Sequence, residues 1–234
     1  MKNAFAGFGI LYLPKDIVAG DFYWFEETDT HRFIASADCT GHGVPGAMVS
    51  VVCSNALTKS VQEDQITDPG SILDRTREIV IRQFEKSKSN VKDGMDISLL
   101  AINKNTGETL WAGAHNPIWI IKKSKNELIE IKGNKQPIGN FESAEPFKTH
   151  PINCETGDRL YMFSDGFADQ FGGEDQLTRD QGGKKFKTKA FKRKLIETAH
   201  KKPQEQISEL ESTLHKWRGN LEQLDDVCVV VILI

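Results

Sequence analysis

The chain has 234 residues and a formal net charge of −3, from 30 Lys and Arg against 33 Asp and Glu. This near-neutral balance does not favour a nucleic-acid binder, whose phosphate contacts require a basic excess. Hydrophobic residues make up 38% of the sequence, so the composition predicts a real core and excludes a disordered segment. We expect a single domain over residues 1–234.

Residues 1–13 are largely apolar, but they contain Lys2, lack a small-residue cleavage site and end at Pro14. These features favour a strand over a signal peptide. No run reaches the roughly 18 apolar residues of a membrane span. The four cysteines lack C-x-x-C spacing, which is typical of free thiols in a reducing compartment. The sequence therefore predicts a cytoplasmic protein with no membrane segment.

Eight segments are rich in β-branched and aromatic residues and are bounded by turn residues, which predicts strands. They are residues 8–13, 32–37, 97–102, 109–112, 118–121, 128–131, 159–164 and 227–234. Residues 103–107 and 122–126 carry the Asn or Gly of tight turns and predict two hairpins. We therefore expect an antiparallel meander in the middle of the chain.

Two helices are predicted before the meander. The first begins near Val44, with Pro45 in its first turn, and we expect its apolar repeat in the core: Val44, Met48, Val51, Val52 and Ala56. The second follows Asp68, a good N-cap, and has an apolar face formed by Ile72, Thr76, Ile79, Val80 and Phe84.

Two further helices are predicted over residues 189–198 and 203–217. The preceding stretch, residues 172–188, is rich in Gly and Lys and has no periodicity. It is either a mobile surface loop or a flap near a site. Its lysine run over residues 184–189 is either a solvated face or a surface that steers an acidic phosphoprotein.

Four aspartates lie at the ends of predicted strands or in tight glycine turns: Asp21, Asp38, Asp165 and Asp226. Taken singly, each is most often a turn former. Four such aspartates in one chain favour a metal site, because Mg²⁺ and Mn²⁺ prefer carboxylate oxygens. A site for two metals needs several carboxylates from separate strands.

Five ordered segments match a known family. They are PKDIVAGDF (14–22), ADCTGHGVPGAM (37–48), AGAHNP (112–117), FSDG (163–166) and LDDV (224–227). From Pro14 to Ile234 the chain resembles the SpoIIE/RsbU-type branch of the metal-dependent (PPM, or type 2C-like) serine/threonine phosphatases. The resemblance implies an α+β fold, a β-sandwich of two antiparallel sheets flanked by helices in α-β-β-α layers. It also implies two divalent ions, Mn²⁺ or Mg²⁺, at one end of the sandwich.

The same resemblance implies the ligands. Asp38 is the bridging carboxylate by its position in the second segment. The remaining ligands implied are Asp21, Asp165, Asp226 beside Asp165, and the backbone carbonyl of Cys39. Asp96 lies where related phosphatases hold a third, weaker metal.

His42 lies between two glycines in the loop after Asp38. It either donates a proton to the leaving serine oxygen, hydrogen-bonds a metal-bound water, or caps the following helix. His115 more simply ties down a loop between strands. We assign Asp16, Asp169 and Asp225 to a second tier, behind the ligands or facing solvent.

The resemblance implies a protein phosphatase that hydrolyses phosphoserine or phosphothreonine on a bacterial signalling protein, of the STAS-type anti-sigma-factor antagonist kind. A water activated by the two metals would perform the hydrolysis. It further implies the C-terminal output domain of a longer regulatory protein, with a homodimer left open. The alternative is a pseudophosphatase that binds a phosphorylated partner without turnover. Such a module is expected to have lost an aspartate ligand, whereas all four are present.

Overall fold

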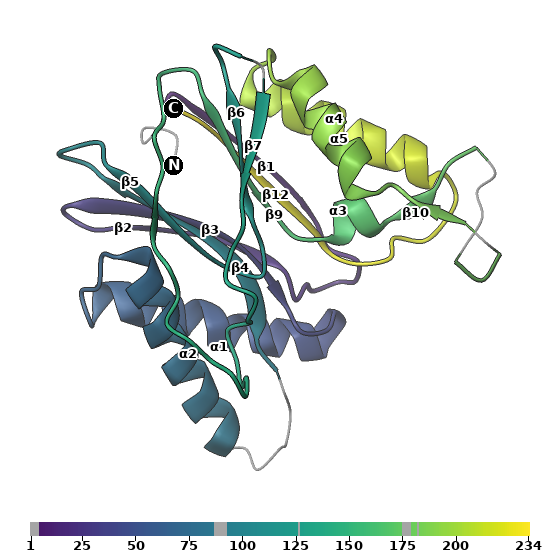
Figure 1. Cartoon of the computed structure of the whole chain (residues 1–234). Coiled ribbons are helices and arrows are strands. Elements are labelled where there is room, and N and C mark those ends of the chain that lie inside the picture. The colour runs from purple at the N-terminus through teal and green to yellow at the C-terminus, as the bar shows by residue number, and fades with distance from the viewer. Residues whose placement is uncertain (1–4, 87–92, 126, 175–178, 182) are drawn as a thin grey trace.

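The computed structural model describes residues 5–86, 93–125, 127–174, 179–181 and 183–234. It contains two five-stranded sheets that pack face to face (Figure 1). In spatial order, sheet A has β1 (Gly7–Leu13), β12 (Val227–Leu233), β9 (Arg159–Phe163), β6 (Ile118–Lys122) and β7 (Glu127–Ile131). Sheet B has β2 (Phe22–Glu27), β3 (His31–Cys39), β4 (Met95–Asn103), β5 (Thr109–Ala114) and β8 (His150–Pro151).

Helices cover the outer face of each sheet (Figure 1). On sheet B lie α1 (Gly43–Gln62) and α2 (Pro69–Lys86), and on sheet A lie α4 (Thr188–Thr198) and α5 (Pro203–Arg218). The short elements are α3 (Gly166–Asp169), a 3₁₀ turn (Arg179–Gln181) and the pair β10 (Phe171–Gly172) and β11 (Lys184–Lys185). All strand pairs within the two large sheets are antiparallel. The predicted α-β-β-α sandwich is therefore confirmed.

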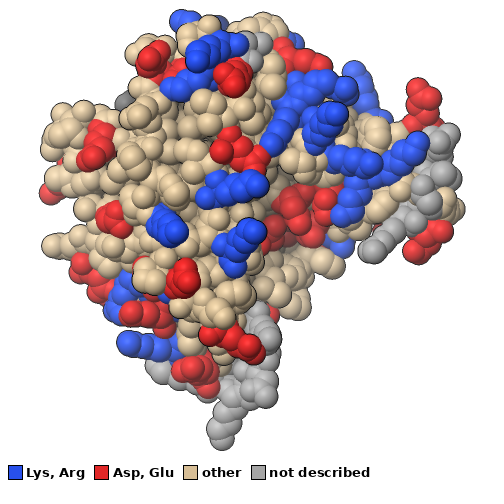
Figure 2. All heavy atoms as spheres, in the orientation of Figure 1, with Lys and Arg blue, Asp and Glu red and all other residues tan. Residues whose placement is uncertain are grey.

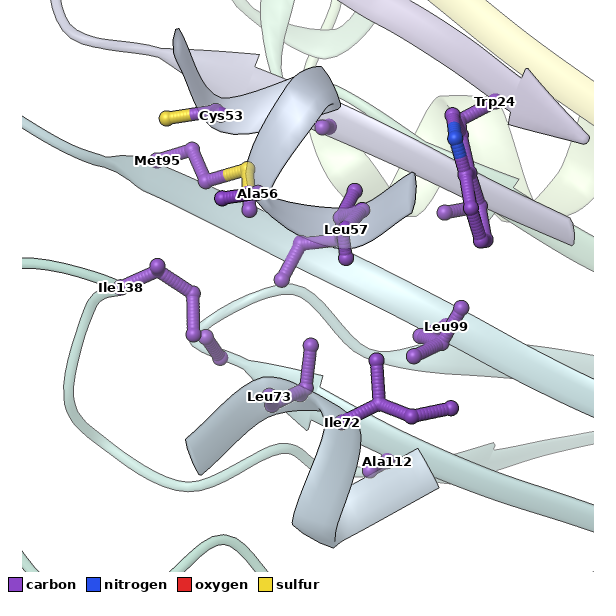
Figure 3. Packing of buried hydrophobic residues seen from close by; sticks show 14 of the residues in the cluster. Trp24, Cys53, Ala56, Leu57, Ile72, Leu73, Met95, Leu99, Ala112 and Ile138 are labelled. Carbon is purple, nitrogen blue, oxygen red and sulfur yellow. The ribbon is translucent and has the colours of Figure 1, made fainter. Parts of the chain in front are cut away.

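Three apolar clusters hold these layers together. One lies between the two sheets, where Trp111 of β5 and Leu100 of β4 meet Val230 of β12. The second joins α4 and α5 to sheet A. The third joins α1 and α2 to sheet B, and Figure 3 shows Leu57 and Ile72 of the helices beside Leu99 of β4. Burial of each such side chain stabilises the fold by about 1.5–3 kcal/mol.

The two predicted hairpins are present, but the meander is not continuous. The β4–β5 hairpin belongs to sheet B and the β6–β7 hairpin belongs to sheet A. The chain crosses between the sheets at residues 115–117, where His115 has a positive φ of 53°. The strand-forming residues predict that each hairpin forms, but they do not indicate which of the two sheets the hairpin belongs to. Residue 126 of the second predicted turn lies outside the described residues.

The predicted core face of α1 is confirmed at Ala56, which is buried, and at Val52, which packs against the core, but it is wrong at its first three positions. Val44, Met48 and Val51 are 69%, 65% and 54% exposed, whereas Val49 and Leu57 are buried. The first half of α1 is apolar on several sides, so its periodicity does not select a face. Other contacts select it: a Cβ on Gly46 would lie 2.2 Å from the Gly41 carbonyl oxygen, and only glycine permits that approach.

The other helices begin and end close to their predicted limits. At the start of α2, the Ser71 amide donates a 2.8 Å hydrogen bond to the Asp68 carboxylate, the expected N-cap. Ile72, Thr76 and Val80 are buried as predicted. Strand β2 was not predicted. In the polar stretch, β10 pairs with β11, while residues 175–178 and 182 lie outside the described part.

None of the helices in the described part of the chain combines the length and apolar composition of a membrane span.

Candidate active site

Three acidic residues of sheet B lie at one end of the sandwich. Asp38 is near the end of β3 and pairs directly with Asp96 of β4 in the antiparallel register. Asp21 immediately precedes β2, and the neighbouring pair Phe22 with Ala37 places it beside Asp38. The register of β2, β3 and β4 therefore brings carboxylates together that are far apart in the sequence.

Sheet A brings two more acidic residues to the same end. Asp165 follows β9 and is the N-cap of α3, and Asp225 lies just before β12. These strands are neighbours, and the Ser164 hydroxyl accepts a 2.9 Å hydrogen bond from the Cys228 amide. A Cβ on Gly166 would lie 2.0 Å from the Asp226 carbonyl oxygen, so glycine is required where the two segments meet.

Except for the buried Asp21, these acidic residues of both sheets open onto one cavity of about 280 Å³. Its wall includes four aspartates, His42 and the glycines of two loops: Asp38, Asp96, Asp165, Asp225, His42, Gly41, Gly94 and Gly139. Figure 2 shows acidic side chains gathered in the region of α3, with Lys and Arg side chains bordering them. An acidic cavity with polar walls is suited to cations rather than to apolar ligands.

Burial and mutual repulsion raise the pKa values of these carboxyl groups. Burial, followed by the charge of Asp38, raises the pKa of Asp21 to about 9. Burial, followed by Asp165 and Asp96, raises the pKa of Asp38 to about 7. The pKa values of Asp96 and Asp165 are also raised, and burial is the largest cause for each. Ionisation of all these carboxyl groups at once is therefore unfavourable unless a positive charge lies among them.

The donor set fits a divalent cation. Asp21 is only 4% exposed, and its Oδ2 atom is buried without a hydrogen-bond partner. A buried carboxylate oxygen without a partner is costly, and a cation would satisfy it. Among the described residues, no three His, Cys, Asp or Glu side chains already converge closely enough to hold one ion. The chemistry therefore fits a metal, although the carboxylates would have to move closer together around it.

The structure places Asp225 and Asp226 in different surroundings from those that the sequence led us to expect. The Asp226 carboxylate is 2% exposed and accepts hydrogen bonds of 2.7 Å from the backbone amides of Lys15 and Gly20, and a longer one from Asp21. It fixes the loop that carries Asp21 and is not part of the cavity wall. Asp225, assigned to the second tier, lines the cavity instead. Both residues precede a strand and point to opposite sides, and the sequence does not reveal which side faces the cavity.

Cys39 has its thiol in the core beneath α1, close to Cys53. A hydrogen bond with this neighbouring thiol, followed by burial, raises the pKa of Cys39 well above its usual range. The thiol therefore stays neutral and does not offer a thiolate to the cavity. Cys39 is nevertheless one of the residues of the cavity wall, and because its thiol lies in the core, its backbone carbonyl is the candidate donor.

His42 lines the cavity and is held from outside by the loop before β2. Its Nδ1 atom lies 2.8 Å from the Asp16 carboxylate, and its Nε2 atom lies 3.0 Å from the Lys15 ammonium. His42 occupies the N-cap position of α1, but its side chain makes no capping hydrogen bond. The structure thus excludes the capping role. Sequence reasoning did not identify Asp16 as the partner of His42, because the two residues are 26 positions apart.

Two other acidic residues near the cavity have basic partners. The His115 Nδ1 atom lies 2.8 Å from Asp96, so His115 ties the crossing between the sheets to β4. Lys185 of β11 lies 2.5 Å from Asp169 of α3, which places part of the lysine run beside the acidic cavity. The interpretation of His115 as a residue that fixes a loop is confirmed.

Comparison with known proteins agrees with this geometry. Residues 28–234 match the family described as Stage II sporulation protein E (SpoIIE). The phosphoserine phosphatase RsbU of Bacillus subtilis (strain 168) is 25% identical over 161 residues, which are 68% of this chain and 45% of RsbU. The chain thus spans about half the length of that curated relative.

Solved structures show the same fold. The SiaA-PP2C domain of Pseudomonas aeruginosa is 27% identical and superposes with a TM-score of 0.83, covering 97% of this chain and 85% of that one. A structure of the PP2C phosphatase domain with a regulatory fragment of SpoIIE from Bacillus subtilis is 21% identical, with a TM-score of 0.73 and coverage of 97% and 63%. The chain therefore belongs to the SpoIIE family, within the PP2C-type serine/threonine phosphatases.

Proposed function

We propose that this chain is a metal-dependent phosphatase that hydrolyses phosphoserine or phosphothreonine on a regulatory protein. The observation that carries the proposal is the convergence of carboxylates from both sheets on one cavity, next to the orphaned Oδ2 atom of Asp21. A structural role does not account for so many buried, mutually repelling acids. The similarity to RsbU, a phosphoserine phosphatase, supports the same reaction class.

Two divalent cations are proposed at this cavity, held by Asp38 between them, by Asp21, Asp165 and Asp225, and by the carbonyl of Cys39. Asp225 replaces Asp226 in this set because Asp225 lines the cavity, whereas the Asp226 carboxylate is occupied by the backbone amides of Lys15 and Gly20. Mn²⁺ or Mg²⁺ there would lower the pKa of water and neutralise the charge of a phosphoryl group. Asp96, held by His115, is the proposed residue for a weaker third ion.

The chain's own residues supply the remaining chemistry. His42 stands at the cavity wall with its Nδ1 atom 2.8 Å from the Asp16 carboxylate, which orients the ring. Its other nitrogen contacts Lys15 on the exposed side, and a bound phosphoprotein would have to displace this contact. We assign to His42 the proton donated to the leaving serine or threonine oxygen.

The surroundings of the cavity suit a protein substrate. The cavity is small and open, and exposed apolar side chains of α1 begin two residues after His42, at Val44, and continue at Met48. A phosphorylated STAS-type anti-sigma-factor antagonist is the proposed partner, in keeping with the relationship to RsbU. All four cysteines are free thiols, which supports a cytoplasmic location. A homodimer stays a prediction.

The alternative is a pseudophosphatase that binds a phosphorylated partner without turnover. One observation favours it: no three described metal-ligating side chains already converge on a single point. The two proposals differ in one measurable respect, because only the enzyme releases phosphate.

The test measures phosphate release from a phosphoserine peptide and from p-nitrophenyl phosphate, with Mn²⁺ and with EDTA. We expect Mn²⁺-dependent release from both, and its loss in Asp38→Asn. Asp29→Asn is the matched control, because Asp29 is exposed in the loop between β2 and β3 and lies outside the cavity wall. Absence of turnover in the presence of Mn²⁺, together with retained binding of the phosphopeptide, would establish the pseudophosphatase instead.

A further inference from the structure

A second, larger cavity lies at the opposite end of sheet A. It has a volume of about 600 Å³ and lies between the last residues of α4 and the ends of β6, β9 and β12. Strand β9 runs from this cavity, at Arg159, to Phe163 near the candidate active site. Figure 1 shows the β6–β7 turn and one end of α4 together at the top of the view. None of the residues that line this cavity lines the acidic one.

The floor of this cavity contains a buried cation without an anionic partner. Arg159 is 6% exposed, and its guanidinium donates hydrogen bonds to the Gln206 side-chain oxygen, at 3.0 Å, and to the Lys201 carbonyl. Both acceptors are neutral. No carboxylate among the described residues lies within ion-pair distance of the Arg159 guanidinium. The adjacent carboxylate, Asp158, forms its ion pair with Lys122, at 2.7 Å. Buried charges are normally paired with an opposite charge. The buried guanidinium of Arg159 has no such counter-ion among the described residues.

The rim of the cavity adds charge of the same sign. Lys123 lines the cavity, and its ammonium has no ion-pair partner among the residues that the structure describes. The one acidic residue in the wall, Glu197, lies 3.6 Å from Arg193 on the preceding turn of α4. The rest of the wall is mostly aliphatic, from Ile196 and Leu233 among others. Charge and shape therefore match an anion that carries an aliphatic portion.

We propose that this cavity binds a small organic anion, with its charged group between Arg159 and Lys123 and its aliphatic part against Ile196 and Leu233. The volume lies within the usual range for small-molecule sites, roughly 300–1,000 Å³. A guanidinium is suited to binding a carboxylate or a related oxyanion through two hydrogen bonds. The site is separate from the proposed phosphatase chemistry and does not depend on it.

The test uses the whole ¹⁵N-labelled chain, titrated with sodium hexanoate and, separately, with neutral 1-hexanol, while amide chemical shifts are recorded. Neither probe is a phosphate ester, so the proposed phosphatase activity cannot consume it. We expect saturable shifts from hexanoate at residues 121–123, 157–159 and 196–200 but not at residues 38–42. A dissociation constant on the order of 1 mM is expected for a probe of this size. Hexanol should bind at least about ten-fold more weakly, because it lacks the charge.

Two variants separate binding from folding. Lys123→Gln removes an exposed charge at the rim and should weaken hexanoate binding roughly three- to ten-fold. Lys125→Gln, in the same turn but outside the cavity wall, should leave it unchanged. Ala199→Leu should block binding by filling the cavity, without touching the hydrogen bonds of Arg159. Equal affinity for hexanol and hexanoate, no saturable shift, or undiminished binding by Lys123→Gln would each overturn the proposal.

Discussion

Replacing Asp226 by Asn tests whether this carboxylate holds a loop or a metal. In the structure it accepts two backbone hydrogen bonds of 2.7 Å and one of 3.4 Å, at 2% exposure. An amide offers one acceptor oxygen, and its NH₂ group would face a backbone N–H. Because hydrogen bonds to a charged group contribute about 1.5–3 kcal/mol each, we expect a loss of about 3 kcal/mol in unfolding free energy. At this chain length that corresponds to a fall in Tm of about 6–12 °C.

The assay is thermal unfolding of Asp226→Asn and Asp225→Asn, each in EDTA and in Mn²⁺. Asp225→Asn removes a charge from the acidic cavity, so its Tm in EDTA should equal or exceed that of the unmodified chain. The rise in Tm that Mn²⁺ produces should be largely absent in Asp225→Asn. Asp226→Asn should show the opposite pattern, with a low Tm in EDTA and a partly retained Mn²⁺ effect. An unchanged Tm for Asp226→Asn in EDTA, combined with complete loss of the Mn²⁺ effect, would refute the reasoning and restore Asp226 as a ligand.

Three further outcomes follow from the structure. The pKa values of Asp21 and Asp38, raised to about 9 and 7, mean that the folded metal-free chain binds more protons than the unfolded chain. Its Tm in EDTA should therefore fall as pH rises from about 5 to 9, and Mn²⁺ affinity measured by calorimetry should rise over the same range. His42→Ala should slow release from phosphoserine by about 10² or more but affect an aryl phosphate far less, and equal losses on both substrates would contradict the general-acid role. In chemical denaturation, Leu57→Ala should cost about 2–5 kcal/mol, whereas Met48→Gln should change stability by less than about 0.5 kcal/mol.

Sequence patterns predicted the strands that are buried on both faces and the positions of the acidic turns. Val and Ile runs such as β12 have strong strand character, and a glycine beside an aspartate marks a strand end where a carboxylate can be presented. The same reasoning identified the family on five short segments. These features are local, so a single stretch of sequence contains the information that they require.

Features that depend on long-range contacts were not predictable in the same way. The buried face of α1 is set by the approach of Gly46 to Gly41, and the choice between Asp225 and Asp226 is set by the direction in which β12 begins. The missing counter-ion of Arg159 depends on which carboxylates lie nearby in space. Periodicity carries none of this information, because each case is decided by a neighbour that is remote in the sequence.

One connection ties the candidate active site to the packing of the whole sandwich. Residues 14–21 join β1 of sheet A to β2 of sheet B and carry Asp21 together with the residues that hold His42. Asp226, at the start of β12, fixes this connection through the backbone of Lys15 and Gly20. Because β1 and β12 are paired along their full length, Asp226 ties this loop to sheet A, while Asp38 belongs to sheet B. The separation of the cavity's carboxylates is therefore set by the apolar layer between the sheets, and a cavity-forming substitution in that layer should alter metal affinity as well as stability.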